Sequence, residues 1–201
     1  MREGLKAAAH AVATLLVLPS IVSWRIRSRV MGRDRALEGS TQAWALVPGL
    51  IGQYLRRAFL AHALDSCATT ATIEFGTIFS SASATIGDRA YIGPGCHLGW
   101  ALIERDVLLA AGVHVPSGGR THGMADPTIP IRDQPSTKAP VRIGAGSWIG
   151  SAAVVMADVG RDAVVGAGAV VVKPIPERTI AGGVPAKVLR HRDLRLEERL
   201  A

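Results

Sequence analysis

The sequence contains few cysteines and few aromatic residues. Its 201 residues include two cysteines, Cys67 and Cys96, and the aromatic fraction is 4%. Two cysteines without metal or redox spacing exclude a disulfide framework and favour reduced, structural thiols in a cytoplasmic compartment. The sequence also lacks zinc-finger spacing, a helix-turn-helix pattern and the aromatic signature of RNA-binding domains. We therefore expect no nucleic-acid partner, although the formal net charge is +7.

The residues that are abundant indicate a globular protein with thin, regular packing. Hydrophobic residues make up 48% of the chain, and 22 residues are Gly. This apolar content is enough for a core, and the length suits one large domain or one domain with a small appendage. The basic balance fits an anionic ligand or an anionic lipid surface.

An aliphatic residue recurs every six positions through the C-terminal two thirds of the chain, and glycine follows it in seven of twelve repeats. A period of six is neither helical nor a plain alternating strand, so it suits short strands joined by tight corners. The aliphatic residue points inward, and glycine follows where the backbone turns closely. Three such sides make one coil of a parallel β-helix. The repeated positions are Ile86, Ile92, Leu98, Ile103, Leu109, Val115, Ile143, Ile149, Val155, Val159, Val165 and Val171.

The chain upstream of the repeats has a helical pattern. Apolar residues recur at helical spacing around Arg56 and Arg57, which fall on the other side of that helix. We predict a helical N-terminal extension over 1–65 in two or three pieces, a β-helix domain over 70–190 and a charged tail with a short helix over 191–201. Because an open β-helix end needs cover, the N-terminal helices are expected to cap the coils.

The first apolar segment, residues 7–24, carries no fixed charge, and Pro19 lies within it. Three interpretations stay open: an anchor through residues 1–30 on the cytoplasmic face of the inner membrane, a helix packed on the protein's own core, and a membrane span or signal peptide. The uncharged segment is followed by Arg25, Arg27 and Arg29, which the anchor interpretation places against anionic headgroups.

The six-residue repeat is interrupted at residues 116–140, a polar segment with five prolines and one histidine, His122. The coils, this segment and the motifs "WIGSAAVV", "VGAGAVVVKPIP" and "AGGVPAKVLR" resemble the hexapeptide-repeat acyltransferases, especially acetyltransferases of sugars, galactosides and xenobiotics. The resemblance implies a left-handed parallel β-helix and a homotrimer with active sites between subunits. The stretch "PGLIGQYLRRAF" resembles the N-terminal extension of acetyltransferases in exopolysaccharide and lipopolysaccharide assembly.

The resemblance also assigns residues to a reaction. It places the catalytic histidine at His122 in "RTHG", where an imidazole can take the proton of an attacking hydroxyl. It implies acetyl-CoA as co-substrate, no metal, a backbone N–H near the thioester, and basic residues facing the phosphates. The residues assigned to acetyl-CoA are Trp148, Ser151, Ala167, Val172, Lys173, Lys187 and Arg190.

The acceptor is the least determined partner. We expect a saccharide hydroxyl, with a lipid-linked saccharide as one option. Residues near the presumed cleft by sequence order match no acceptor motif; they are Glu74, Arg120, Asp126 and Arg132.

Three alternatives remain at this stage. A γ-class carbonic-anhydrase-like zinc lyase would use three histidines, for which His97, His114 and His122 can be nominated. A trimeric, non-catalytic module on a membrane would need no acetyl-CoA. A serine acetyltransferase also has helices before its coils, but its aspartate–histidine pattern is missing here.

Overall fold

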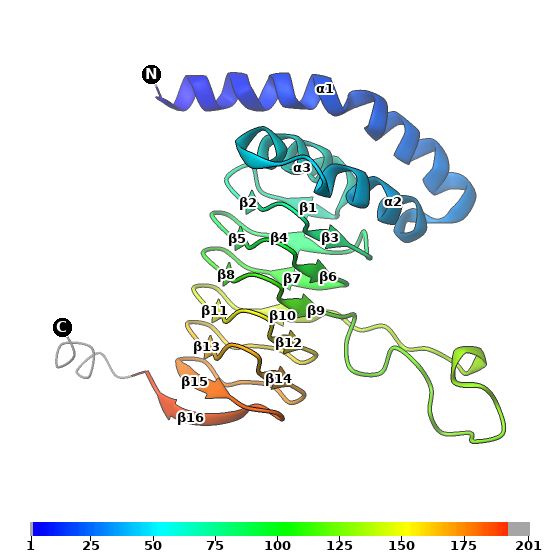
Figure 1. Cartoon of the computed structure of the whole chain (residues 1–201), viewed down its shortest axis with the longest axis vertical. Helices are drawn as coiled ribbons and strands as arrows, with labels where there is room; N and C mark the ends of the chain where they lie inside the picture. The colour runs from blue at the N-terminus through cyan, green and yellow to red at the C-terminus, as the bar shows by residue number, and fades with distance from the viewer. Residues whose placement is uncertain (1, 193–201) are drawn as a thin grey trace.

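The computed structural model describes residues 2–192 and shows a stack of parallel coils with helices over one end (Figure 1). The predicted parallel β-helix is confirmed. Three sheets form its sides, and strands that pair within a sheet come from consecutive coils, apart from the last pair, which is antiparallel.

The first side contains β1 (Ser66–Cys67), β4 (Thr85–Ile86), β7 (Ala101–Ile103) and β10 (Val141–Ile143), and it continues through parallel bridges at Val159 and Ile175. The second side contains β2 (Thr72–Ile73), β5 (Tyr91–Ile92), β8 (Leu108–Leu109), β11 (Trp148–Ile149), β13 (Val164–Val165), β15 (Thr179–Gly182) and β16 (Lys187–His191). The third side contains β3 (Ile78–Phe79), β6 (His97–Leu98), β9 (His114–Val115), β12 (Val154–Val155) and β14 (Val170–Val171).

The predicted aliphatic positions form the core of the stack. Each of the twelve is at most 2% exposed, and they lie in register, as in the pairs Ile86–Ile103 and Ile92–Leu109. Glycine follows seven of the twelve, and at all of these except Gly166 the absence of a side chain has a steric cause. A Cβ atom on Gly150 would overlap the backbone of Ala167 in the next coil. The sequence repeat is therefore set by coil spacing as well as by the core.

Gly150→Ala is expected to lower the free energy of unfolding by about 1–3 kcal/mol, because the added methyl group must push two coils apart. Gly39→Ala is the matched control. Gly39 lies in a helix, and nothing would contact its Cβ within 4 Å, so this change should raise stability by about 0.5–1 kcal/mol. Urea unfolding followed by circular dichroism measures both; equal effects would contradict the steric explanation.

Three helices cover the N-terminal end of the stack, as predicted: α1 (Arg2–Met31), α2 (Arg33–Ala45) and α3 (Gly49–Ala63). Side chains of the helices satisfy backbone groups of the first coil. The Thr41 hydroxyl donates to the Phe79 carbonyl (3.3 Å), and Asp34 accepts from the Ala82 N–H (2.9 Å). The cap therefore closes the end hydrophobically and by hydrogen bonding.

Arg56 corrects one expectation about these helices. It was assigned to a polar helix face, but it is 2% exposed and donates to the carbonyl oxygens of Ile73 (2.9 Å), Trp44 (3.2 Å) and Val47 (2.6 Å). α3 is covered by α1 and rests on the coils, so little of its surface faces water. Arg56 therefore joins the cap to the first coil and is not available to a membrane.

The boundaries of the β-helix also differ from the prediction. The first coil begins at Ser66, so the coils start four residues earlier than expected. At the other end, β16 pairs antiparallel with β15 and includes His191. The short helix predicted for 191–201 is not present at His191, and residues 193–201 lie outside the described residues.

Candidate functional site

The segment 116–140, here called the excursion loop, leaves the stack between β9 and β10 and extends away from it (Figure 1). Its base is fastened by hydrogen bonds. The Ser117 carbonyl accepts from the Ala139 N–H (3.0 Å), and the Ser117 hydroxyl accepts from the Trp100 N–H (3.0 Å). The loop therefore projects from a fixed stem, which limits where its side chains can reach.

Gln134 organises the far part of the excursion loop. This side chain is 8% exposed, and its amide donates to the carbonyl oxygens of Asp126 (2.7 Å) and Ile129 (2.9 Å). Asp126 in turn accepts from the Thr128 N–H and hydroxyl, which lowers the pKa of its carboxyl. Gln134 could not be predicted as an organising residue, because a side-chain amide in a loop follows no periodic pattern.

His122 lies in the excursion loop with its side chain exposed. Among the hydrogen bonds between described residues, none involves its imidazole. The loop leaves the stack midway, whereas β16 with Lys187 and Arg190 lies at the stack's far end. A single chain thus does not bring His122 together with the basic end of the predicted donor site, and the role of His122 stays a prediction.

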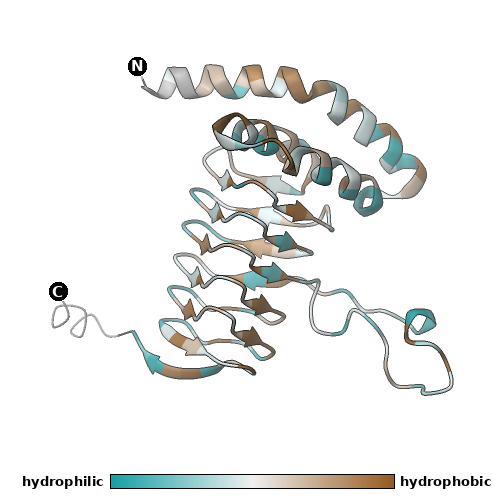
Figure 2. Cartoon of the chain, viewed as in Figure 1, coloured by the Kyte–Doolittle hydropathy of each residue, from teal (hydrophilic) through white to brown (hydrophobic). Residues whose placement is uncertain are grey.

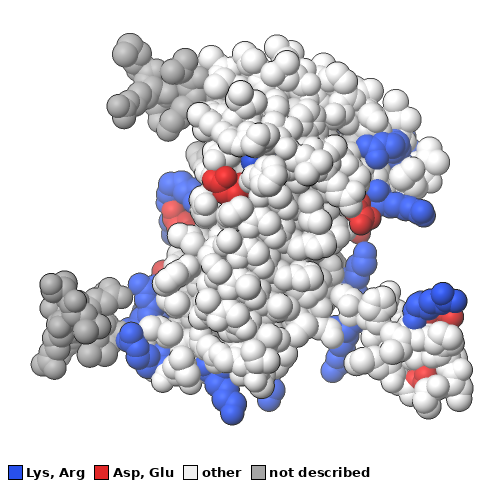
Figure 3. All heavy atoms as spheres, in the orientation of Figure 1, with Lys and Arg blue, Asp and Glu red and all other residues white. Residues whose placement is uncertain are grey.

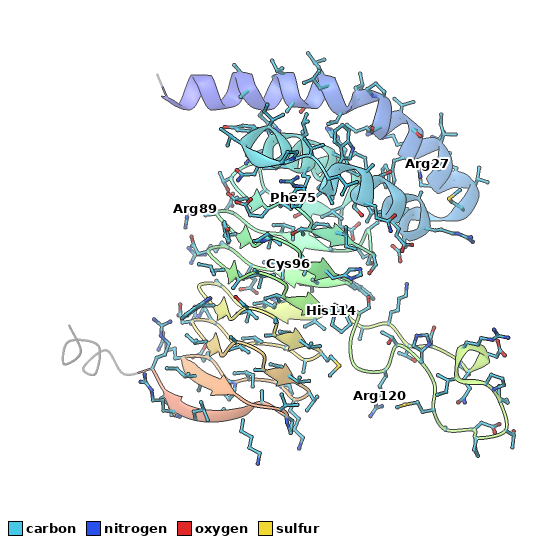
Figure 4. The ribbon with its side chains drawn as sticks, in the orientation of Figure 1. Arg27, Phe75, Arg89, Cys96, His114 and Arg120 are labelled. Atoms are coloured by element: carbon cyan, nitrogen blue, oxygen red, sulfur yellow. The ribbon has the colours of Figure 1, made fainter. Side chains whose placement is uncertain are left out.

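One predicted donor residue does meet the excursion loop. Val172 follows β14, is 46% exposed, and lines a hollow of about 420 Å³ together with Met156 and the loop residues Gly119 and Arg120. Figure 4 shows Arg120 between the excursion loop and the lower coils. The sequence suggested Arg120 only by its position near the presumed cleft. In the structure, Arg120 lines a hollow next to the third sheet.

Ser151 and Ala167 occupy the same corner in consecutive coils. The Gly168 N–H donates to the Ser151 carbonyl (2.8 Å), and both Ser151 and Ala167 are exposed. Within residues 2–192, their own N–H groups take part in none of the backbone hydrogen bonds. An extended ligand with amide groups could pair with such free donors. The equivalent corner residue Ala111 has the same property, so the geometry alone does not single out Ser151.

Trp148 stands on the outer face of the second sheet. It is in register with Leu108 of the preceding coil, which is in register with Tyr91. The three residues are 51%, 42% and 36% exposed, so they form an apolar column on the surface of the chain. Exposed apolar columns of this kind favour contact with another molecule.

The last coil carries the basic residues predicted to face phosphates. Lys187 and Arg190 are exposed on β16, opposite Gly182 and Ile180 of β15. Lys173 is exposed after β14. Figure 3 shows Lys and Arg spread around the lower coils, with few acidic side chains beside them on this face. This end of the stack therefore attracts anions.

Removing two of these charges tests their role. Lys187→Ala together with Arg190→Ala is expected to weaken coenzyme A binding about tenfold or more, and to weaken dephospho-coenzyme A binding less, because charge-assisted hydrogen bonds to the 3′-phosphate are lost. Calorimetry with both ligands measures the difference. Equal losses would show that these residues do not contact that phosphate.

The zinc alternative nominated His97, His114 and His122, and the first two do come together. Their rings stack with centroids 5.1 Å apart and planes 9° apart. Nitrogen lone pairs lie in the ring plane, so two stacked imidazoles cannot both point at one ion. Burial and the neighbouring His97 lower the pKa of His114. Within residues 2–192, no group of three His, Cys, Asp or Glu residues is placed to hold a metal.

Glu74 and the two cysteines lie in surroundings that suit a structural role. Glu74, suggested for the acceptor, accepts from Gln53 of α3 (2.8 Å) under the helical cap, well before the excursion loop along the stack. Cys67 and Cys96 are free thiols. Burial raises the pKa of Cys67 to about 12 and that of Cys96 to about 11. Both are therefore thiols at neutral pH, in line with the structural reading.

Comparison with known proteins agrees with this geometry. Residues 140–173 match the family described as the hexapeptide repeat of succinyl-transferase. Rv3034c of Mycobacterium tuberculosis, whose name describes an acetyltransferase, is 47% identical over 78 residues, covering 38% of this chain and 26% of the relative. WbbJ of Escherichia coli K12, whose name assigns it to lipopolysaccharide biosynthesis as an O-acetyl transferase, is 33% identical over 122 residues, covering 57% of this chain and 61% of WbbJ.

A solved structure extends the likeness to the fold. Galactoside acetyltransferase in complex with coenzyme A aligns with a TM-score of 0.65 at 22% identity, over 82% of this chain and 83% of that protein. The chain is thus a hexapeptide-repeat β-helix protein, and its resemblance to the acyltransferases with this repeat is confirmed. The matched stretches span less than two thirds of Rv3034c and of WbbJ.

Proposed function

We propose that this protein is an acetyl-CoA-dependent O-acetyltransferase acting on a saccharide hydroxyl in cell-surface polysaccharide assembly in the cytoplasm. The observation that carries the proposal is the excursion loop, which interrupts an otherwise regular stack and presents an exposed histidine. Relatives named as acetyltransferases, one of them assigned to lipopolysaccharide biosynthesis, support the reaction and the acceptor class.

In the proposed mechanism His122 acts as general base. A sugar hydroxyl is a weak nucleophile, so its proton must leave as the oxygen attacks the thioester carbonyl. The imidazole takes that proton and then passes it to the departing thiolate, which restores neutral histidine. A free backbone N–H at Ser151 stabilises the negative oxygen that develops during attack. The new bond is an ester, and the bond that breaks is the thioester.

Acetyl-CoA supplies the activated acetyl group, and the structure offers suitable contacts for it. The free N–H groups at the corners of Ser151 and Ala167 suit an extended chain of amides. The hollow beside Val172 lies next to the loop that carries His122. Lys187 and Arg190 supply positive charge for phosphates at the end of the stack.

We also propose that the working form is a homotrimer. Two observations support it. The excursion loop projects from its own stack, so His122 would meet donor residues of a neighbouring subunit more readily than its own. The exposed column of Tyr91, Leu108 and Trp148 supplies apolar surface for such a contact.

An acceptor screen with labelled acetyl-CoA tests the proposed reaction. It should include free sugars, oligosaccharides, lipid-linked glycans and serine. Label is expected in a saccharide ester. Transfer to serine would favour the serine acetyltransferase alternative. Absence of acetyl-CoA binding by calorimetry would favour a non-catalytic module and would overturn the proposal.

A further inference from the structure

One face of α1 is a continuous apolar stripe that nothing in the described chain covers. Leu15, Val22 and Ile26 are 69%, 48% and 58% exposed. At 100° per residue these positions fall within about 40° of one another around the helix axis. Val12, Leu16, Leu18 and Val30 are also exposed and border the same stripe. Figure 2 shows hydrophobic residues recurring along α1, which lies across the end of the stack.

The opposite face of α1 is occupied by the protein. Ala13, Val17, Ile21 and Trp24 are at most 6% exposed and belong to the hydrophobic core. Arg27, which the sequence suggested for lipid contact, instead donates to the Ser40 hydroxyl (2.6 Å) and the Ala36 carbonyl of α2 (3.1 Å). By length and composition the helix could cross a membrane. Crossing would require this whole face to leave the cap.

Positive charge lies beside the stripe on the free side of the helix. Arg25 and Arg29 are exposed, and neither forms an ion pair among the described residues. Both fall on the exposed half of the helical wheel, next to Leu18 and Val22. The part of α1 from Ala7 to Met31 holds no acidic residue. An apolar stripe flanked by arginines without acidic neighbours complements an interface of acyl chains and anionic headgroups.

We propose that α1 is an in-plane membrane anchor that binds an anionic lipid surface through Leu15, Val22 and Ile26 with Arg25 and Arg29, while its other face stays packed on α2 and α3. The helix lies flat and does not span. Because α1 crosses the capped end of the stack, the coils stand away from the bilayer, with β16 farthest from it (Figure 1). This inference does not depend on the identity of the acyl acceptor.

Vesicle sedimentation tests the proposal with the full-length protein. The probes are vesicles of phosphatidylcholine alone and vesicles in which phosphatidylglycerol makes up about 30% of the lipid. The protein is expected to bind the anionic vesicles and to lose binding as salt rises. Leu15→Gln with Val22→Gln and Ile26→Gln should lower the partition coefficient about tenfold or more. Arg25→Gln with Arg29→Gln should reduce binding to anionic vesicles to the level on neutral ones, since each arginine contributes about fivefold.

Val184→Gln with Leu189→Gln is the matched control, because it removes exposed apolar side chains (73% and 68%) at the other end of the stack. Its vesicle binding should equal that of the wild type. Failure of the wild-type protein to bind either vesicle would overturn the proposal. Undiminished binding by the triple variant would also overturn it. A smaller particle mass of the triple variant than of the wild type, both without lipid, would overturn it as well, because the stripe would then be a contact between copies of the chain. Acetyl transfer measured on the same samples keeps this result separate from the enzymatic proposal.

Discussion

Replacing His122 by alanine is expected to lower acetyl transfer by about 10²–10⁴-fold, the usual contribution of a general base. Folding should be unaffected, because the His122 side chain is exposed and lies on a loop whose stem is fastened by Ser117 and whose far part is organised by Gln134. The loss should therefore appear in kcat. Steady-state kinetics with the acceptor found in the screen, together with acetyl-CoA titration by calorimetry, separates turnover from binding.

His62→Ala is the matched control, since His62 is also exposed but lies on α3 in the cap. Its turnover should stay close to that of the wild type. Near-normal turnover of His122→Ala would remove His122 from the mechanism. A large fall in acetyl-CoA affinity with unchanged kcat would instead make it a binding residue.

The repeat predicted the stack because two neighbouring positions in each repeat are constrained. The aliphatic residue must fill the core, and the following residue must let the next coil approach, as Gly150 does with Ala167. The first coil escaped this pattern. Cys67, Ile73 and Phe79 continue the period of six, but Ala68, Glu74 and Ser80 follow them where glycine follows elsewhere. With only one of the two signals present, no repeat positions were identified in the first coil, and its start was predicted at residue 70 instead of Ser66.

The cap shows the limit of helical periodicity. A single period predicts one buried face, whereas α3 packs against α1 on one side and the coils on the other. Arg56 was therefore assigned to solvent although it is buried, and Arg27 was assigned to lipid although it holds α1 to α2. Long-range contacts decide these positions, and a local pattern carries no information about them.

The candidate site likewise has a part that the sequence predicts and a part that only the structure shows. The excursion loop and its histidine could be located from the sequence because they interrupt the repeat, and the family resemblance assigned the basic residues at the end of the stack. The hollow that joins Arg120, Met156 and Val172 could not, since these residues come from separate coils and the loop. Which distant sequence positions become neighbours depends on the register of the coils, and the repeat alone does not give that register across the excursion loop.

The buried Arg56 supports the largest expected change in stability. Arg56→Met keeps most of the side-chain volume but removes all of its donors. The carbonyl oxygens of Ile73, Trp44 and Val47 would each lose a hydrogen bond in a site without room for a well-placed substitute. The Trp44 carbonyl keeps a hydrogen bond from the Val47 N–H (3.3 Å), whereas the carbonyls of Ile73 and Val47 are left without one from any described residue. Because an unpaired buried acceptor costs about 1–3 kcal/mol, the free energy of unfolding should fall by about 3–5 kcal/mol. Urea unfolding followed by circular dichroism measures it.

Arg57→Met is the control at the next position. Arg57 donates to one described carbonyl, that of Ala71 (2.8 Å), and its guanidinium lies over the Tyr54 ring at 4.7 Å. The side chain is half-buried, so water can replace part of what is lost, and the expected destabilisation is about 1 kcal/mol. If the two variants unfold at the same urea concentration, Arg56 does not hold the cap on the first coil. A much larger loss for Arg56→Met alone would establish that the charged residue, which helical periodicity assigned to the surface, joins the helices to the β-helix.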